Sequence, residues 1–271
     1  MLDLVVLLIG QAVIAAVLLV CWTLIARPTT SRRQDLVRGG VSFAAALVLA
    51  GLGVFWFGNL AGTQAFGHLL ARVETRDSVV ALSFDDGPTP EGTSSVLSLL
   101  ASRGVRATFF VNGQAVGDHM AQAKEIVAAG HELGNHGYTH SVLIGKPAWR
   151  IRNEVELTEQ RIREAGFSGV VRFRAPFDLK LASLPLYLAR TNRQSVTWDV
   201  APDGGENDAR DTDAIVRTTL SQVRPGSIVA LHVMQANRAA TLRALPAIID
   251  GLKARGYRFV TVNELLALRT A

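Results

Sequence analysis

Predicted strands and helices alternate from about residue 78 onward, and this order constrains the fold more than any other feature of the sequence. Segments rich in β-branched and aromatic residues occur at 79–84, 107–111, 131–135, 170–175, 195–198, 227–231 and 258–262. Segments of helical composition lie between them, at 94–104, 121–130, 152–166, 212–223 and 241–256. Several of these end on glycine, as helices commonly do. The alternation predicts an α/β domain with a parallel sheet, either open or closed into a barrel.

The N-terminal region has a different composition. Residues 4–26 and 39–62 carry no formal charge and are each long enough to span a bilayer. The first run also lacks the positive leader of a cleaved signal peptide, and the segment between the runs, RPTTSRRQDLVR, holds four arginines against one aspartate. Because basic residues in short loops stay cytoplasmic, the pattern predicts a two-helix membrane anchor at 1–66, a linker at 67–77 and an extracytoplasmic domain at 78–269. The predicted location is the cell (inner) membrane, with the lipid bilayer as a partner.

Composition restricts the other partners. The net charge of +5 is spread along the chain, and the outer domain has no basic cluster of the kind that binds nucleic acid. No obligate protein partner is indicated. The only cysteine, Cys21, lies in the first apolar run, so the outer domain has no disulfide. A domain of about 200 residues buries enough surface to fold without one.

Chemically active side chains follow directly after several predicted strands, where parallel α/β folds build their sites. In chain order they are Asp85 and Asp86 in SFDDGPTP, His136 and His140 in HGYTH, Arg174, Asp199, Asp203 and His232. One carboxylate and two imidazoles form an ordinary ligand set for a catalytic Zn²⁺. A second carboxylate beside the metal ligand is available as a base. We therefore expect one aspartate of the adjacent pair to hold a metal while its neighbour takes a proton.

Each of these signals has a simpler interpretation when taken alone. Asp-Gly-Pro is a common turn, and two histidines spaced as in HGYTH often share the surface of one helix. Their occurrence together at successive strand ends is what favours a site. The remaining histidines, His68, His119 and His131, are interpreted as structural or solvent-facing.

Five segments in order, SFDDGP, ATFFVNG, GHELGNHGYTH, RAPF and IVALH, resemble the motifs of the polysaccharide deacetylase family, also called the NodB-homology domain or carbohydrate esterase family 4. The resemblance covers roughly residues 75–268. It implies a distorted (β/α) barrel with fewer than eight strands and one divalent metal ion, zinc foremost, with Co²⁺, Ni²⁺ or Mn²⁺ as alternatives. It also implies hydrolysis of N- or O-acetyl groups on an acetylated glycan such as peptidoglycan, poly-N-acetylglucosamine or a chitooligosaccharide.

The resemblance also implies roles for the metal-binding part of the site. Asp85 would be the general base, and Arg174 would keep it ionised and oriented, because a nearby cation favours the charged form of a carboxyl group. Asp86, His136 and His140 would be the metal ligands.

The remaining roles concern the acid and the substrate pocket. His232 would protonate the leaving group. Phe177 stands where the family usually has tyrosine, and its backbone N–H would stabilise the oxyanion. Trp198 and Leu231 would line the pocket for the acetyl methyl group, and Asp203 is the nearest candidate to tune the acid.

The sequence departs from the family in the fourth motif, which usually reads W-x-V-D-x-x-D-W and is WDVAPDGGEND here. Ala201 replaces its first aspartate, and the closing tryptophan is missing. The aspartate that tunes His232 is therefore Asp203, Asp199 or Asp208. In addition, Asp178 replaces the glycine that usually follows the third motif. These changes leave the metal-binding part intact and indicate an altered substrate preference.

Two functions remain in competition at this point. The first is a membrane-anchored, metal-dependent deacetylase that releases acetate from a cell-wall or surface glycan. The second is a catalytically weak or silent glycan-binding membrane protein that keeps the same fold. The degenerate fourth motif favours the second, whereas retention of both Asp85 and His232 favours the first, because binding alone requires neither.

Overall fold

The computed structural model describes residues 32–58, 64, 66–204 and 211–269 of the 271-residue chain. The chain forms two compact units, Met1–Leu60 and Ala61–Ala271.

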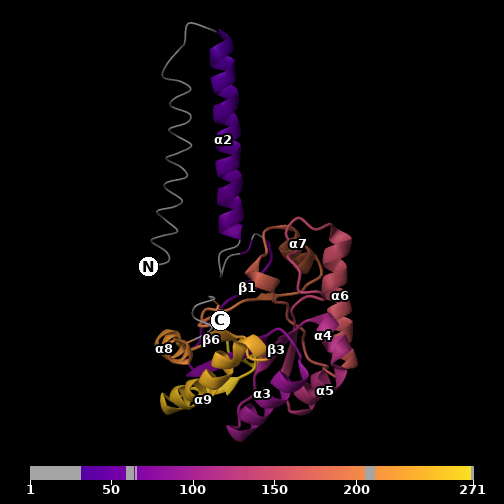
Figure 1. Ribbon diagram of the computed structural model, residues 1–271, viewed down its shortest axis with the longest axis vertical. Coiled ribbons are helices and arrows are strands. Elements are labelled where there is room, and N and C mark those ends of the chain that lie inside the picture. The colour runs from indigo at the N-terminus through magenta and orange to yellow at the C-terminus, as the bar shows by residue number, and fades with distance from the viewer. Residues whose placement is uncertain (1–31, 59–63, 65, 205–210, 270–271) are drawn as a thin grey trace. The chain divides into compact units, whose positions relative to one another are not determined.

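Helix α2, Arg32–Gly58, belongs to the first unit (Figure 1). Within the described part of the chain, no helix is long and apolar enough to cross a membrane, so the described residues do not support the predicted span at 39–62. Its described part begins inside the arginine-rich segment, so charged residues occupy the first turns, and residues 59–62 of the predicted span lie outside the described residues. The other predicted span, 4–26, lies outside the described residues.

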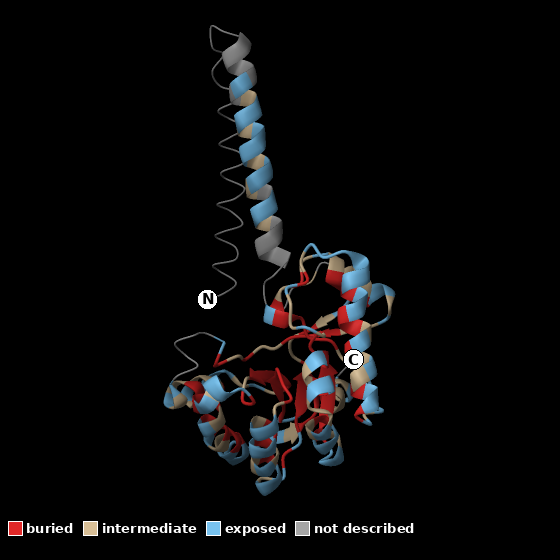
Figure 2. Cartoon of the chain, turned by 45° about the vertical axis from the view of Figure 1, so that its right-hand side comes forward, coloured by how far each residue is buried: buried red, intermediate tan, exposed pale blue. Residues whose placement is uncertain are grey.

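The second unit is built on a parallel sheet with strand order β4-β3-β2-β6, and β7 also pairs with β2. The strands are β2 Val79–Asp85, β3 Thr108–Val111, β4 Glu132–Asn135, β6 Ser227–Leu231 and β7 Arg258–Val260. Every residue of β2 is buried, and buried residues concentrate on the strands in Figure 2. Because all pairs are parallel, the carboxyl ends of the strands meet at one edge of the sheet.

The helices between these strands confirm the predicted alternation. They are α3 Pro90–Ser102, α4 Gly113–Asp118, α5 Met120–Ala128, α6 Ala148–Glu164, α7 Ser183–Arg190, α8 Thr212–Gln222, α9 Ala239–Ala254 and α10 Val262–Ala267. Short 3₁₀ helices occur at Pro176–Asp178 and Ala236–Arg238. Side-chain caps fix two of the starts: Asp211 accepts hydrogen bonds from the first turn of α8, and Thr261 forms a capping box with Glu264 in α10.

A smaller pairing joins β1, Leu69–Leu70, to β5, Ser195–Val196. The predicted linker therefore contributes to this unit, since β1 lies within it and Val73 is fully buried. The strand predicted at 170–175 is not formed; a single bridging residue, Phe173, contacts Asn135 and Ser195 instead. The parallel α/β sheet is confirmed, whereas closure into a barrel stays a prediction.

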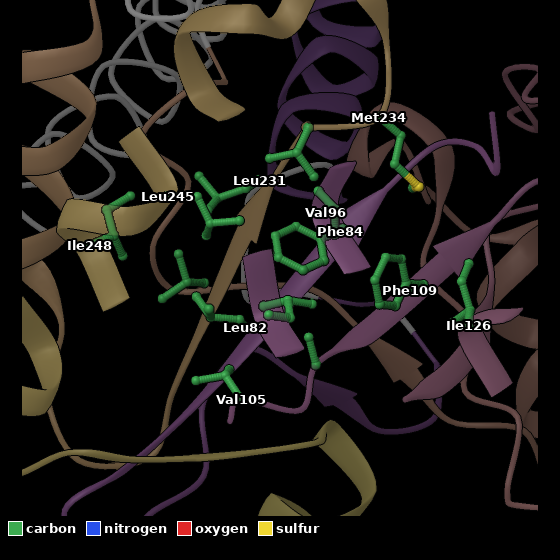
Figure 3. Close-up of a cluster of buried hydrophobic side chains, with 14 of the residues drawn as sticks. Leu82, Phe84, Val96, Val105, Phe109, Ile126, Leu231, Met234, Leu245 and Ile248 are labelled. Carbon is green, nitrogen blue, oxygen red and sulfur yellow. The ribbon is translucent and has the colours of Figure 1, made fainter. Parts of the chain in front are cut away.

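Because side chains alternate along β2, one face of the strand is apolar and the other carries the polar side chains of the candidate site. Val80, Leu82 and Phe84 point into the largest hydrophobic cluster, between the sheet and helices α3, α5, α8 and α9 (Figure 3). Burial of each such side chain contributes about 1.5–3 kcal/mol to the free energy of folding. Since successive side chains of a strand point to opposite faces, Ser83 and Asp85 lie on the other face of β2. The packing of one face thus fixes where the acid of the other face points.

Candidate active site

Asp86 lies in the turn after β2, and its carboxylate faces two imidazoles. Asp86 Oδ1 is 3.9 Å from His136 Nε2 and 3.2 Å from His140 Nε2. The possible ligand atoms of the three residues all lie within 4.8 Å of one another. Asp86 and His140 have φ of 66° and 52°, in the left-handed region that aspartate and histidine adopt more readily than most residues. The backbone turn at each strand end therefore directs the side chains into one cluster.

The chemistry of this cluster fits a divalent metal ion. His136 Nδ1 donates a hydrogen bond to the Arg174 carbonyl oxygen over 2.9 Å, which fixes the tautomer and leaves Nε2 free toward Asp86. Asp86 and His136 are buried, and His140 is partly exposed. One carboxylate oxygen and two imidazole nitrogens are a usual protein contribution to a catalytic zinc site, which keeps a position open for water and substrate.

Glu154 holds the loop that carries His140, and the sequence analysis did not single it out. Its Oε2 accepts hydrogen bonds from the backbone N–H groups of Tyr138 and Thr139, both at 2.8 Å, and its Oε1 accepts from Thr139 Oγ1 at 2.6 Å. Glu154 is buried on the inner face of α6, between Ile151 and other inward residues. The sequence signal that could have identified it is a glutamate at a position of α6 that faces the buried side of the helix.

Gln235 is a second residue that the sequence analysis missed. Its Nε2 donates to Asp86 Oδ2 over 3.0 Å, so the carboxylate of Asp86 is held at one oxygen while the other faces the histidines. Nothing in the local sequence indicates this contact, because Gln235 lies in a loop far along the chain.

Asp85 is buried beside this cluster and pairs with Arg174. The distance between Asp85 Oδ1 and Arg174 Nη1 is 2.5 Å, and neither side chain is more than 2% exposed. Burial by itself raises the pKa of Asp85, but the Arg174 guanidinium, with smaller contributions from His136 and His232, holds that pKa below its ordinary value. Asp85 is therefore an ionised carboxylate at neutral pH, which is the form that accepts a proton.

Arg174 is itself fixed on several sides. Nη1 also donates to Ser83 Oγ at 2.9 Å, and Nη2 donates to the Thr197 carbonyl oxygen at 3.0 Å. The guanidinium lies 3.9 Å from the ring centre of Phe110 and 5.4 Å from that of Trp198, within the range of cation–π attraction. The structure thus places Trp198 beside Arg174, on the side of the sheet that carries Asp85.

Leu231 is not on that side. It is the last residue of β6, lies opposite Phe84 in the register and is fully buried in the cluster against α9 (Figure 3). Its side chain therefore points away from Asp85, and the prediction that it lines an acetyl pocket is wrong. The next residue, His232, points to the site because side chains alternate along a strand.

His232 is paired with Asp203. Nδ1 of His232 donates to Asp203 Oδ1 over 3.2 Å, and the backbone N–H of His232 donates to Asp203 Oδ2 over 2.8 Å. Asp203 is fully buried and also accepts from Thr241 Oγ1 at 3.1 Å. Burial by itself lowers the pKa of His232, but the hydrogen bond to Asp203 and the charge of Asp85 raise it above its ordinary value. The imidazole is thus suited to donate a proton near neutral pH.

The structure distinguishes between the candidate aspartates for the partner of His232. Asp199 is engaged elsewhere, since its carboxylate accepts from Ser227 Oγ at 2.8 Å and from the Ile228 N–H at 2.9 Å. Asp208 lies outside the described residues. Among the described aspartates, Asp203 is the one that contacts the His232 ring.

Phe177 and Asp178 form a left-handed turn, with φ of 58° and 55°. The Phe177 ring is 58% exposed and its centre lies 4.5 Å from that of His140. Its backbone N–H has no hydrogen-bond acceptor among the described residues. Asp178 anchors the turn: its Oδ1 is 2.5 Å from Lys180 Nζ and accepts from Thr197 Oγ1 at 3.0 Å. An ion pair thus stands where the family usually has a flexible glycine.

His131 has a structural role, as expected. It is buried, and its Nδ1 accepts a hydrogen bond from the Ala107 N–H over 3.2 Å. Burial lowers its pKa to about 4, so the ring stays neutral in the folded protein.

Sequence comparisons agree with the site. A family model described as polysaccharide deacetylase matches residues 72–205. The chain is 31% identical over 200 residues to a peptidoglycan-N-acetylglucosamine deacetylase of Bacillus cereus, which covers 74% of this chain and 93% of that protein. It is 33% identical over 198 residues to a chitooligosaccharide deacetylase of Bradyrhizobium sp. (69% and 90%). A bifunctional xylanase/deacetylase of Pseudobutyrivibrio xylanivorans is 34% identical over 216 residues, which are only 33% of that larger protein.

Solved structures give the same fold. A CE4 family pseudoenzyme from Bacillus anthracis matches with a TM-score of 0.67 at 26% identity, over 75% of this chain and 70% of that chain. A mutant of that protein with restored enzymatic activity also gives 0.67, at 27% identity, over 75% of this chain and 72% of the mutant chain. The identities and coverages of the relatives, taken with the motifs at the strand ends, show that this chain belongs to the polysaccharide deacetylase family.

Proposed function

We propose that this protein is a metal-dependent deacetylase that hydrolyses N-acetyl groups on a glycan and releases acetate. One observation carries the proposal: an ionised, buried Asp85 stands next to the Asp86, His136 and His140 cluster and close enough to His232 for its charge to affect that ring. A base, a metal-binding cluster and an acid therefore face one space.

The residues divide the reaction as follows. Asp85 takes a proton from the attacking water, and Arg174 keeps the carboxylate ionised and fixed in direction. The Phe177 N–H donates a hydrogen bond to the oxygen that becomes negative as the acetyl carbon turns tetrahedral. His232, protonated and held by Asp203, gives its proton to the leaving nitrogen as the C–N bond breaks. Water is thereby added across the amide, and the products are acetate and an amine.

The metal would be held by Asp86, His136 and His140. Zinc fits this donor set best, with Co²⁺, Ni²⁺ or Mn²⁺ as alternatives. When bound, such an ion supplies Lewis acidity toward the acetyl carbonyl group and the attacking water.

The substrate is proposed to be a polymer or oligomer of N-acetylglucosamine, in peptidoglycan, poly-N-acetylglucosamine or a chitooligosaccharide. The names of the Bacillus cereus and Bradyrhizobium relatives support this class. O-acetyl groups on a xylan-like polymer come second. We further propose that the domain acts outside the cytoplasm, where cell-wall glycans are accessible. A fusion of alkaline phosphatase to the C-terminus tests this location, because that reporter is active only when it is exported.

A catalytically silent glycan-binding protein is the second candidate. It is supported by the altered fourth motif and by the fact that one structural relative is a pseudoenzyme. The Asp203–His232 pair argues against it, since the altered motif still delivers a buried aspartate to the acid histidine.

The experiment is a measurement of acetate release by the full chain on chitooligosaccharides, peptidoglycan and acetylated xylan, with added Zn²⁺ or with a chelator. Asp85→Asn is the test variant, and Asp250→Asn, an exposed aspartate on α9, is the matched control. We expect release that requires metal and Asp85 but not Asp250. A folded, metal-loaded protein that releases no acetate from any substrate would instead support the binding function.

A further inference from the structure

A hollow of about 410 Å³ lies away from the candidate active site. Its lining comes from the C-terminal half of α6, from residues 168–172 and from residues 191–194. The last two segments run into Phe173 and Ser195, which bridge to one another in parallel, whereas Arg174 and Trp198 of the site come after these bridging residues. The hollow therefore lies at the amino ends of these segments, and the site lies at their carboxyl ends.

Charge distinguishes this hollow. Its lining carries three arginines, Arg163, Arg172 and Arg193, against one carboxylate, that of Glu159. The arginines come from separate segments, so no run of basic residues in the sequence indicates them. The remaining polar side chains of the lining are uncharged hydroxyls and amides. The lining is therefore positively charged overall, which favours an anionic ligand.

Glu159 is shared between two of the arginines. Its Oε2 accepts hydrogen bonds from Arg193 Nε at 3.1 Å and from Arg193 Nη2 at 3.0 Å, and its Oε1 is 3.6 Å from Arg163 Nη2. Arg163 Nη1 also donates to the carbonyl oxygens of Phe167 and Gly169, at 2.8 and 2.7 Å. The carboxylate thus holds two guanidinium groups in position but balances the charge of only one.

Arg172 has no carboxylate among its hydrogen-bond partners in the described structure. Its Nε donates to Asn263 Oδ1 over 2.9 Å and its Nη1 donates to Gln194 Oε1 over 2.7 Å, and both acceptors are neutral amides. Glu132 interacts with Arg172 electrostatically, but burial raises the pKa of Glu132 to about 7, so this carboxyl group is only partly ionised at neutral pH. An anion in contact with the half-buried guanidinium of Arg172 would therefore be stabilising.

We propose that this hollow binds a phosphate group, with Arg172 as its principal partner and with Arg163 and Arg193 beside it. Guanidinium groups present parallel N–H donors that match the spacing of phosphate oxygens, and a phosphate has enough oxygens to contact several guanidinium groups at once. A soluble phosphate compound and a phospholipid headgroup present the same oxygens to the arginines. The inference is independent of the proposed deacetylase reaction.

The first test measures the binding of radiolabelled inorganic phosphate to the full chain by equilibrium dialysis, with Zn²⁺ bound and again after treatment with a chelator. We expect binding that persists without metal and weakens as salt is added, because ions screen charges near the surface. Arg172→Gln should weaken it by about tenfold or more, the effect of losing a charged hydrogen-bond partner. Arg217→Gln, at an exposed position of α8, should leave it unchanged.

A second pair of variants leaves the packing around Arg172 intact. Ser168 is an exposed residue of the lining, so Ser168→Asp adds a carboxylate at the rim. This like charge should weaken phosphate binding by about threefold to tenfold. Ser98→Asp, which adds the same charge at an exposed position of α3, should have no effect. No binding after chelation, or equal effects of these two substitutions, would overturn the proposal.

Competition for the labelled phosphate then identifies its source. Dihexanoyl phosphatidylglycerol, used as a monomer below its micelle concentration, presents a lipid headgroup, and glycerol phosphate presents a soluble phosphate compound. Displacement by both, weakened in Ser168→Asp, would support the site and point to a headgroup. Displacement by glycerol phosphate alone would support the site and point to a soluble compound. Displacement by neither would mean an adventitious ion only and would overturn the proposal.

Discussion

The two halves of the site are built in different ways. The metal-binding half, Asp86, His136 and His140, comes from turns directly after β2 and β4, and each residue lies in a short contiguous motif. The acid half pairs Asp203, in a loop with an altered motif, with His232 at the end of β6. The structure brings the candidate residues of each half into contact, although only the first half follows the family sequence closely.

This difference shows what each half requires. A metal cluster needs three ligand atoms at fixed distances, so each of its ligands depends on the local turn that orients it. The proposed acid, His232, needs only one buried carboxylate within hydrogen-bonding distance of a ring nitrogen, and loops of different sequence can supply that carboxylate. Asp203 satisfies this requirement while also accepting from the His232 N–H and from Thr241. The altered motif has therefore changed the surrounding loop and kept the acid pair.

The largest effect is expected from His232→Ala, which removes the proposed acid and spares the metal ligands. General acid catalysis contributes about 10²–10⁴-fold, so kcat should fall by that factor while Zn²⁺ affinity, measured by calorimetry, stays unchanged. His68→Ala, at an exposed position, is the matched control. A His232→Ala protein that keeps full activity would show that the acid half is not used.

Glu154→Gln tests the support of the metal-binding half. The substitution keeps the size of the side chain but places an amide donor against the N–H groups of Tyr138 and Thr139. We expect the affinity for Zn²⁺ to fall by about 10–100-fold, the usual cost of losing a residue that orients a ligand. Glu156→Gln, on the outer face of the same helix, should have no effect on metal affinity. Equal affinities in the two variants would mean that the His140 loop holds its position without Glu154.

Asp203→Asn should give a smaller loss, visible mainly in the pH profile. Asp203 raises the pKa of His232, so its removal lowers that pKa. The imidazolium then loses its proton at a lower pH, and because the acid must be protonated to act, the alkaline limb of kcat moves to lower pH. Asp199→Asn should not move it, since Asp199 binds Ser227 and Ile228 instead. A shift with Asp199→Asn alone would contradict the pairing seen in the structure.

The same contrast explains what could be predicted from the sequence. Local sequence patterns determine the alternation of strands and helices and the residues at the strand ends. The parallel sheet and the Asp86, His136 and His140 cluster could therefore be predicted from the sequence. The partner of His232 was not, because Asp203 and His232 are joined only by tertiary packing, and counting residues in an altered loop left three candidates. The prediction that Leu231 lines the acetyl pocket was wrong for a related reason. Leu231 is adjacent to His232 in sequence, but because side chains alternate along β6 it points to the other face of the sheet.

Contacts between distant segments account for the other differences. Gln235 reaches Asp86 from a loop after β6, and no local pattern indicates it. Residues 170–175 have the composition of a strand, yet only Phe173 bridges to its neighbours.

The smallest effect is expected from Phe177→Tyr, which restores the residue usual in the family. The proposed contribution of this position is its backbone N–H, and the ring is largely exposed, tilted against that of His140. An exposed substitution that keeps the backbone changes the free energy by about 0.5 kcal/mol or less, so kcat/KM should stay within about twofold of the parent. A larger change would mean that the side chain itself contacts substrate. Phe177 would then be a determinant of substrate preference beside His140, and the departure from the family sequence would reach the metal-binding half as well as the acid half.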